Sequence, residues 1–205
     1  MEESNVRRLG AGRLTATVAL TGAVLQVVYG VLACVWTYPR ITGQAFEAVW
    51  GLATLGMIAN VFSWLAIGVA RPRRLAVTGG ALAIAGFAAR FVISVVIVAD
   101  PRIDTDTTSV AVAIPVTIVL MFGGLALLGI ATRRAHRLDG TAAWAPLLVL
   151  AAGLVAAPFY SFDRLVHFIL LGLLWGSGWL YMALIGYRHA TADAVAGAPR
   201  SPAVV

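Results

Sequence analysis

An arginine in the middle of a long apolar run is the residue of this sequence best placed to do chemistry. Arg90 lies inside the run 75–99. A guanidinium at the centre of a bilayer costs about 2.5–3.5 kcal/mol on insertion scales, so it persists where it faces other helices, pairs, or lines a wet cavity. Gly86, Arg90 and Ser94 are spaced by four residues and share one helical face. Because this face is small and polar, we expect it to point into a helical bundle.

Two carboxylates are the candidate partners of Arg90. Glu47 stands at the outer start of the second apolar run, and Asp163 stands in the outer turn between the last two runs. Asp100 is on the same helix as Arg90, about 15 Å away at 1.5 Å per residue, which is too far for a direct pair. We therefore expect an outward-facing polar pocket that holds Arg90 with Glu47 or Asp163 and suits a small anion or a lipid headgroup. The alternative is an interhelical ion pair, or an arginine whose guanidinium reaches outward to the interface, without a further role.

Three uncharged polar side chains also fall inside apolar runs: Gln26, Asn60 and Ser63. Amides in such positions often join helices through hydrogen bonds worth about 0.6–2 kcal/mol. The same groups can contact a solute. Helix-to-helix bonding is the favoured role of these groups and a solute contact is the alternative, for which Asn60 and Ser94 are the candidate binding residues beside Arg90.

Signatures of catalysis and of metal or nucleotide binding are absent from the sequence. No Cys, His and Asp cluster has zinc spacing, and no phosphate-cradling Gly-Lys-Ser/Thr loop occurs. The two histidines on facing helices that a b-type heme needs are lacking. Ser177, between Gly176 and Gly178, superficially resembles an intramembrane serine-protease motif, but His167 lies ten residues earlier in the same run. We predict no catalytic residue, no metal and no cofactor, and an enzyme is the less favoured class.

Composition predicts a membrane protein. Apolar residues make up 60% of the chain and charged residues 12%, against about 25% charged residues in soluble domains. The apolar residues form six runs, each near the roughly 20 residues that cross a bilayer. We predict an all-α, polytopic integral membrane bundle of six transmembrane helices, at 12–36, 46–70, 75–99, 110–132, 141–160 and 165–187.

The predicted spans divide the chain into three parts. Residues 1–11 form a cytoplasmic N-terminal segment, and residues 12–187 form the transmembrane domain. Residues 188–205 are rich in Ala, Pro and Gly, so we expect a disordered cytoplasmic tail.

The distribution of arginine predicts the orientation, because cytoplasmic loops carry an excess of positive charge. One side of the predicted bundle carries most of the arginines, namely Arg7, Arg8, Arg13, Arg71, Arg73, Arg74, Arg133, Arg134, Arg137, Arg188 and Arg200. The other side carries only Arg40, Arg102 and Arg164. We expect a plasma-membrane protein with both termini cytoplasmic. Clusters of this kind between spans also argue against nucleic acid as a partner.

The predicted outer ends of the spans are rich in aromatic residues, and such rings favour the headgroup level of a membrane. We therefore expect them to anchor the bundle in the lipid bilayer rather than to form a binding site. The residues are Trp36, Tyr38, Phe46, Trp50, Phe159, Tyr160 and Phe162.

Two further patterns concern how the helices associate. Arg13-Leu14, Arg74-Leu75 and Arg137-Leu138 precede the odd runs at spacings of 61 and 63 residues, which suggests three repeated helical hairpins. Chance matches in a chain rich in Ala, Leu and Arg are the alternative. Gly172 and Gly176 form a Gly-x-x-x-Gly pattern that predicts close helix contact, and a homo-oligomer stays open.

Cys34 is the only cysteine, so no internal disulfide can form. The preceding residues 31–33 loosely resemble a lipoprotein cleavage site. The apolar run before it is longer than the 7–15 residues of a signal-peptide core, so we interpret Cys34 as part of the first span, with lipidation as the alternative.

Three functions remain consistent with these patterns. The favoured one is a small transporter or a solute- or lipid-binding membrane protein with a polar pocket near Arg90. The second is an intramembrane enzyme on a lipid or isoprenoid, with Glu47, Asp100 or Asp163 as acids. The third is an accessory or scaffold protein that acts through helix contacts.

Overall fold

The computed structural model of the chain is a bundle of helices, and it describes residues 2–35, 43–100, 102–103, 108–159 and 164–196. No strand occurs in these ranges, so the all-α prediction is confirmed. The elements in chain order are α1 (Glu2–Val35), α2 (Gly43–Ala66), α3 (Arg73–Ala99), α4 (Thr108–Ala135), the 3-10 helix η1 (Gly140–Trp144), α5 (Ala145–Ala156), α7 (Arg164–Ile169), the π-helix η2 (Leu170–Trp175) and α8 (Gly176–Ala196).

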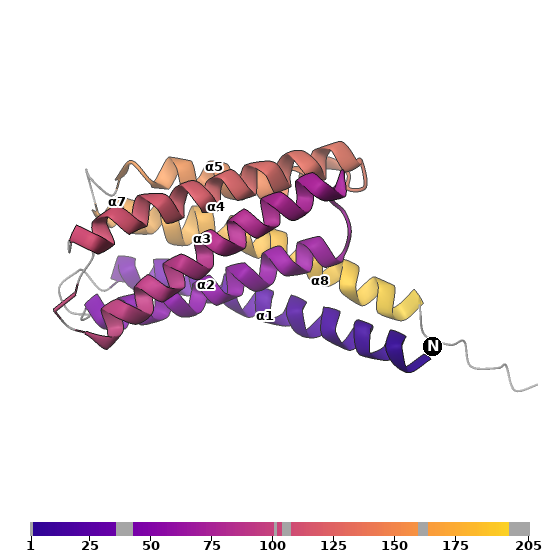
Figure 1. Ribbon diagram of the computed structural model, residues 1–205, viewed down its shortest axis with the longest axis horizontal. Helices are drawn as coiled ribbons and strands as arrows, with labels where there is room; N and C mark the ends of the chain where they lie inside the picture. Colours follow the sequence, from indigo (N-terminus) through magenta and orange to yellow (C-terminus); the bar gives the residue numbers. More distant parts are fainter. Residues whose placement is uncertain (1, 36–42, 101, 104–107, 160–163, 197–205) are drawn as a thin grey trace, which may run out of the picture.

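The long helices run alternately up and down the bundle, with α7, η2 and α8 following one another as a single rod (Figure 1). Each helix packs against the next one in the chain from α1 to α5, and α5 packs against η2 and α8. Helix α8 also packs against α1 and α2, which closes the bundle. The start of α1 and the end of α8 lie at the same end of the molecule (Figure 1).

Five helical segments are long and apolar enough to cross a membrane, judged by length and composition alone. The predicted run 141–160 differs, because its apolar helical stretch covers only Gly140–Ala156 and begins with the 3-10 helix η1. The last rod is longer than predicted, since α8 continues to Ala196, past the predicted end at 187 and into the segment 188–205 expected to be disordered. Helix α1 likewise starts at Glu2, inside the predicted segment 1–11.

Glycines set the close approach of α1 to its neighbours. A Cβ atom on Gly30 would overlap the Cα of Gly172 in η2, and one on Gly22 would overlap the Cα of Gly56 in α2. A Cβ on Gly176 would meet Gln26 and Val27 of α1 at 3.2–3.3 Å. The Gly-x-x-x-Gly pattern therefore makes the close helix contact that its spacing predicts. This contact lies within the chain, so it offers no argument for an oligomer.

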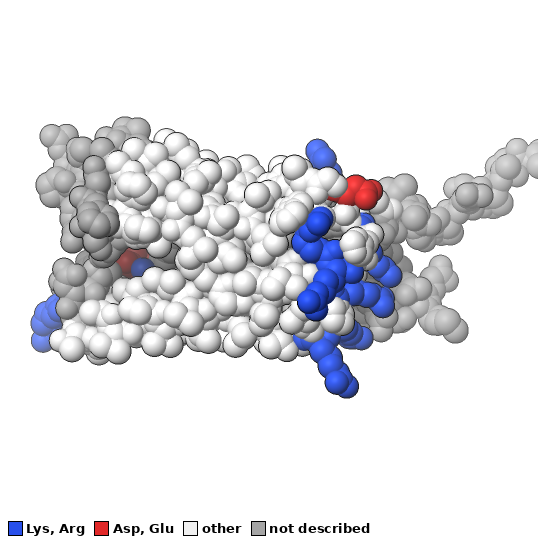
Figure 2. Space-filling view, turned by 90° about the horizontal axis from the view of Figure 1, so that it is seen from above, with Lys and Arg blue, Asp and Glu red and all other residues white. Residues whose placement is uncertain are grey.

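Large side chains fill the centre of the bundle, while many valines and leucines face outward. The buried set includes Trp64, Trp175, Trp179, Phe87 and Met57. Figure 2 shows a broad surface almost free of charge, with the basic side chains gathered toward one end. A helical bundle whose sides are apolar and whose charges gather at an end is compatible with a membrane protein. No observation tests the suggested three-hairpin repeat, which stays a prediction.

Candidate binding site

Arg90 of α3 forms a buried ion pair with Glu47 of α2. Its Nη2 donates hydrogen bonds of 2.9 Å to both carboxylate oxygens of Glu47. Each of the two side chains keeps only 11% of its surface exposed. The predicted inward orientation of Arg90 is therefore correct, and of the two predicted partners it is Glu47 that pairs with it. Asp163 lies outside the described residues.

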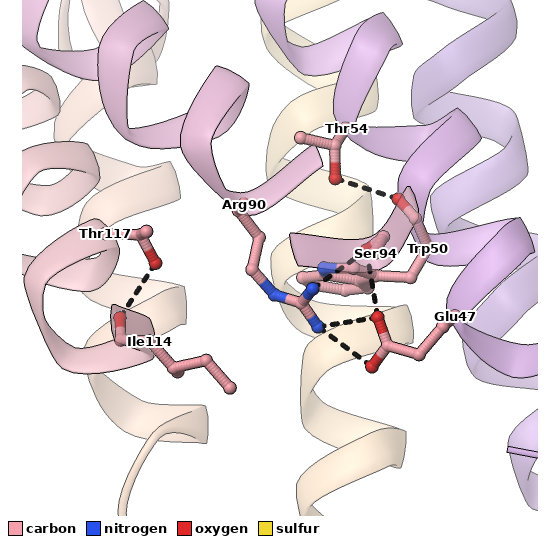
Figure 3. Close-up of polar contacts among 7 residues, drawn as sticks. All are labelled: Glu47, Trp50, Thr54, Arg90, Ser94, Ile114 and Thr117. Atoms are coloured by element: carbon pink, nitrogen blue, oxygen red, sulfur yellow. Dashed lines mark hydrogen bonds and ion pairs between the residues drawn. The ribbon is translucent and has the colours of Figure 1, made fainter. Parts of the chain in front are cut away.

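Ser94 completes the contact, as Figure 3 shows. Arg90 Nη1 donates to Ser94 Oγ at 2.8 Å, and Ser94 Oγ donates to Glu47 Oε2 at 2.9 Å. The three side chains thus form a closed ring of hydrogen bonds between α2 and α3. The helical stripe of Gly86, Arg90 and Ser94 explains this geometry: Gly86 is buried against α4, where a Cβ would meet Thr117 O and Met121, and Ser94 is buried against α2.

An indole ring forms one wall of the site. The Cζ atom of Arg90 is 5.7 Å from the centroid of Trp50, which is within range of a cation–π interaction. Trp50 is buried, and its ring also contacts Tyr29 and Trp175 with centroids 5.2 and 5.8 Å apart. The expectation that Trp50 anchors the bundle at the headgroup level is therefore wrong, because the ring turns into the core instead of toward lipid.

The other side of Arg90 faces α4. Figure 3 places Ile114 and Thr117 there, across from Glu47 and Trp50. The hydroxyl of Thr117 donates to the carbonyl of Ile114 at 2.8 Å, so its hydrogen is used within its own helix. The guanidinium is thus bonded on the α2 side and meets no hydrogen-bonding partner from α4.

The guanidinium retains hydrogen-bonding capacity. Arginine carries five N–H groups, and the bonds to Glu47 and Ser94 account for three of them. Nε–H and one Nη1–H have no partner within the part of the chain that the structure describes. Two donors are therefore available to a further group, although the charge of Arg90 is already balanced by Glu47.

The pair lies near the end of the bundle opposite the arginine cluster. In Figure 2, acidic and basic atoms show at the bottom of a hollow toward that end of the bundle. The small exposed fraction of Arg90 and Glu47 agrees with a place at the bottom of such a hollow. The polar group is therefore recessed from the apolar side of the bundle and still reachable.

The side-chain amides of Gln26 and Asn60 both bond to the continuous rod of α7, η2 and α8. Asn60 is buried and its Nδ2 donates to Trp179 O at 3.0 Å. Gln26 Nε2 donates to Leu171 O at 3.4 Å. Both bonds join helices, which is the role that the sequence favoured for them. Asn60 does not touch the ring of Arg90, Glu47 and Ser94.

The sequence interpretation missed Trp175, Trp179 and the π-helix between α7 and α8. The four-residue spacing of the two tryptophans places them on one helical face, which was the available signal. Their rings meet at 6.1 Å, and Trp179 also meets Phe87 at 5.4 Å. Among the described residues, no group of three or more His, Cys, Asp or Glu side chains could hold a metal ion.

Comparisons of the chain with protein-family models, with curated proteins and with solved structures find no match.

Proposed function

We propose that the chain is a six-span plasma-membrane protein, with both termini cytoplasmic, that binds a small polar solute or a lipid headgroup at Arg90. The observation that carries the binding site is the recessed ring of Arg90, Glu47 and Ser94, which leaves two guanidinium N–H groups without a partner among the described residues.

The span that completes the six is the short stretch Gly140–Ala156, which is the fifth in chain order. Its five 3-10 residues rise about 2.0 Å each and its twelve α-helical residues about 1.5 Å each. The sum is about 28 Å, close to the roughly 30 Å of a bilayer core. The 3-10 start therefore supports a full crossing by a segment that looks too short as an α-helix.

The orientation rests on the loops that join the helices. The turns after α2 and α4 lie at the end that holds the start of α1 and the end of α8 (Figure 1). These turns and the helix ends beside them carry arginines such as Arg71, Arg73, Arg133 and Arg137. An excess of arginine favours the cytoplasmic side. The hollow beside Arg90 would then lie in the outer half of the membrane.

The charges of the site indicate which ligand fits. Because Glu47 neutralises Arg90, a bare anion would add an unbalanced charge to a poorly solvated place, which is costly. A zwitterion places an acidic group on the free guanidinium hydrogens and a cationic group near Glu47. A free amino acid and a phosphoethanolamine headgroup both have this chemistry. The site therefore fits a zwitterion better than the small anion that Arg90 alone would suggest.

One observation favours the scaffold role instead. Arg90, Glu47 and Ser94 already hydrogen-bond to one another. Such a ring is sufficient to join α2 to α3 without any ligand. The intramembrane enzyme is less well supported, because Glu47 is the only acid in the described ion-pair ring, and it is bound to Arg90 on both oxygens.

Thermal unfolding of the protein in nanodiscs separates these roles. Glycine serves as the free zwitterion and acetate as the bare anion, each added to nanodiscs of phosphatidylglycerol, whose headgroup has no cationic group. Nanodiscs in which phosphatidylethanolamine replaces part of this lipid provide the headgroup arm. A ligand at ten times its Kd stabilises a protein by about 1.4 kcal/mol, which raises the Tm of a chain of this size by about 3–6 °C.

We expect glycine or phosphatidylethanolamine to raise the Tm of the wild type and of Arg102→Gln, the matched control at an exposed arginine. The increase should vanish in the double variant Glu47→Gln/Arg90→Gln, which removes both charges and so avoids leaving one of them unpaired. The two arms identify the source of the ligand. A shift with acetate alone would overturn the zwitterion assignment, and no shift in any arm would overturn binding and leave the scaffold role.

A further inference from the structure

Five buried polar atoms have no hydrogen-bonding partner within the described residues: Gln26 Oε1, Trp50 Nε1, Asn60 Oδ1, Trp175 Nε1 and Trp179 Nε1. A buried donor or acceptor left without a partner costs about 1–3 kcal/mol. Native proteins therefore satisfy most such groups with protein atoms or with ordered water. Five of them in one core call for a common explanation.

The five groups surround one short segment of the chain, η2 and the first turn of α8. Trp175 and Trp179 belong to this segment, and Trp50 stacks on Trp175. Gln26 donates to Leu171 O and Asn60 donates to Trp179 O. The unpartnered groups are therefore neighbours in space, although they come from α1, α2 and the last rod.

The orientation of both amides follows from their partners. Each amide nitrogen donates to a backbone carbonyl, and a carbonyl cannot accept from an amide oxygen. Turning either amide over would place oxygen against oxygen. The unpartnered atoms are thus acceptors on Gln26 and Asn60 and donors on the three indoles. The two amide oxygens are both acceptors, so they could not hydrogen-bond to each other.

The backbone is also unusual at this place. Gly176 N–H donates to Leu171 O, five residues earlier, which is the hydrogen bond of a π-helix. Leu171 O accepts from Gln26 as well. Single π-helical turns inside α-helices occur frequently at functional sites. The irregular turn therefore coincides with the group of unpartnered atoms.

We propose that ordered water molecules bond these unpartnered groups beside η2 and the start of α8, and so form an inner polar site that begins at the Arg90–Glu47 pair. Uncharged donors and acceptors together fit a small uncharged molecule that both donates and accepts, and water is the smallest of these. Along α2, Glu47 and Asn60 are thirteen residues apart, or about 20 Å at 1.5 Å per residue. A file of several water molecules fits this length better than one compact solute.

This inference deepens the proposed function, because a hydrated interior behind Arg90 gives a bound polar solute a path into the bundle. Its test needs no ligand, so the two proposals can fail separately. A dry interior would remove the path and leave binding at Arg90 intact. An absent ligand shift would remove the binding and leave the water.

Hydroxyl-radical footprinting with mass spectrometry tests the proposal on the full-length protein in nanodiscs. Radicals produced from water inside a protein oxidise the side chains next to that water, even where bulk solvent does not reach. Trp64 is the internal control, because it is fully buried like Trp179 but its Nε1 donates to Thr132 Oγ1 at 2.9 Å. We expect Trp175 and Trp179 to be oxidised several times faster than Trp64.

A second variant locates the water. A Cβ on Gly153 would lie 3.1 Å from Trp175 Nε1 and 2.8 Å from the ring of Phe122, so Gly153→Ala brings a methyl group against this indole once the ring of Phe122 has shifted. Gly123→Ala is the matched control, since nothing lies within 4 Å of its Cβ. Oxidation of Trp175 should fall in Gly153→Ala alone. Equal protection of Trp64, Trp175 and Trp179 would overturn the proposal, and so would unchanged oxidation of Trp175 in Gly153→Ala.

Discussion

The described residues contain two arginine–carboxylate pairs that have the same chemistry and opposite surroundings. Arg90–Glu47 joins two helices, and each side chain is 11% exposed. Arg102–Asp100 joins residues two apart in the turn after α3, with side chains 90% and 35% exposed. Their shortest distances are 2.9 and 3.1 Å, so distance does not separate them. The difference lies in desolvation, which makes a buried pair costly to break and an exposed pair almost neutral.

Removing one partner should show the largest contrast. Arg90→Gln leaves the carboxylate of Glu47 buried without a cation, so we expect a loss of about 3–5 kcal/mol in the free energy of unfolding. Arg102→Gln should stay within about 0.5 kcal/mol of the wild type. Thermal and denaturant unfolding in one detergent measures both. Equal losses at the two positions would remove the distinction between the pairs.

A double-mutant cycle at each pair sharpens the same contrast. The double variant Glu47→Gln/Arg90→Gln has no charge at either position, so no buried charge is left unpaired. Much of the stability lost in Arg90→Gln should therefore return. We expect a coupling energy of about 2 kcal/mol or more between Glu47 and Arg90, and about 0.5 kcal/mol or less between Asp100 and Arg102. Additive single effects at the buried pair would argue that the two side chains do not act together.

Ser94 belongs only to the buried pair and gives a smaller effect. Ser94→Ala removes the bond from Arg90 Nη1 and the bond to Glu47 Oε2, and we expect a loss of about 1–2 kcal/mol. Thr117→Ser is the control, because it lies on α4 at the other side of Arg90 and keeps the hydroxyl that bonds within α4. It should lower the free energy of unfolding less than Ser94→Ala. An unchanged unfolding midpoint in Ser94→Ala would show that the serine is dispensable to the ring.

A change of salt concentration should produce the smallest effect on stability. It should distinguish the two pairs only because one is exposed to solvent and the other is buried. Raising the ionic strength to 1 M shortens the Debye length to about 3 Å and screens exposed charges. The coupling between Asp100 and Arg102 should disappear, while that between Glu47 and Arg90 should persist. Repeating the two cycles at 0.05 M and 1 M salt, in the range of that screening argument, gives the comparison. Similar salt dependence at both pairs would mean that solvent reaches Arg90 freely.

The sequence was sufficient to predict the all-α bundle and, within the site, the inward face of Arg90 and Ser94 and the candidate acid Glu47. Long apolar runs can bury their backbone amides only as helices in a membrane, and the four-residue spacing of Gly86, Arg90 and Ser94 fixed the face that turns inward. The cost of an isolated guanidinium then required a nearby acid, and Glu47 was one of two candidates. These inferences depend on local spacing and on charge, which the sequence contains.

The remainder depended on contacts between distant segments. The position of Trp50 against Arg90 and Trp175 follows from how α2 meets the last rod, and no local pattern separates a ring that faces lipid from one that faces the core. The π-helix η2 likewise has no sequence signature that we recognise. The end of α8 was misjudged because its alanine-rich segment with scattered charges has helical propensity as well as the composition of a tail.

The central claim is that the ring around Arg90 is reached from the outer side of the membrane, and cysteine accessibility tests it most directly. In a Cys34→Ser background, Glu47→Gln/Arg90→Cys introduces a thiol at the ring, where the side chain of Arg90 is 11% exposed, and Ser63→Cys introduces one at a buried serine further along the bundle. A membrane-impermeant thiol reagent applied to intact cells should label the first variant and spare the second. Labelling of the Arg90→Cys variant only after the cells are opened, or in neither state, would contradict the account.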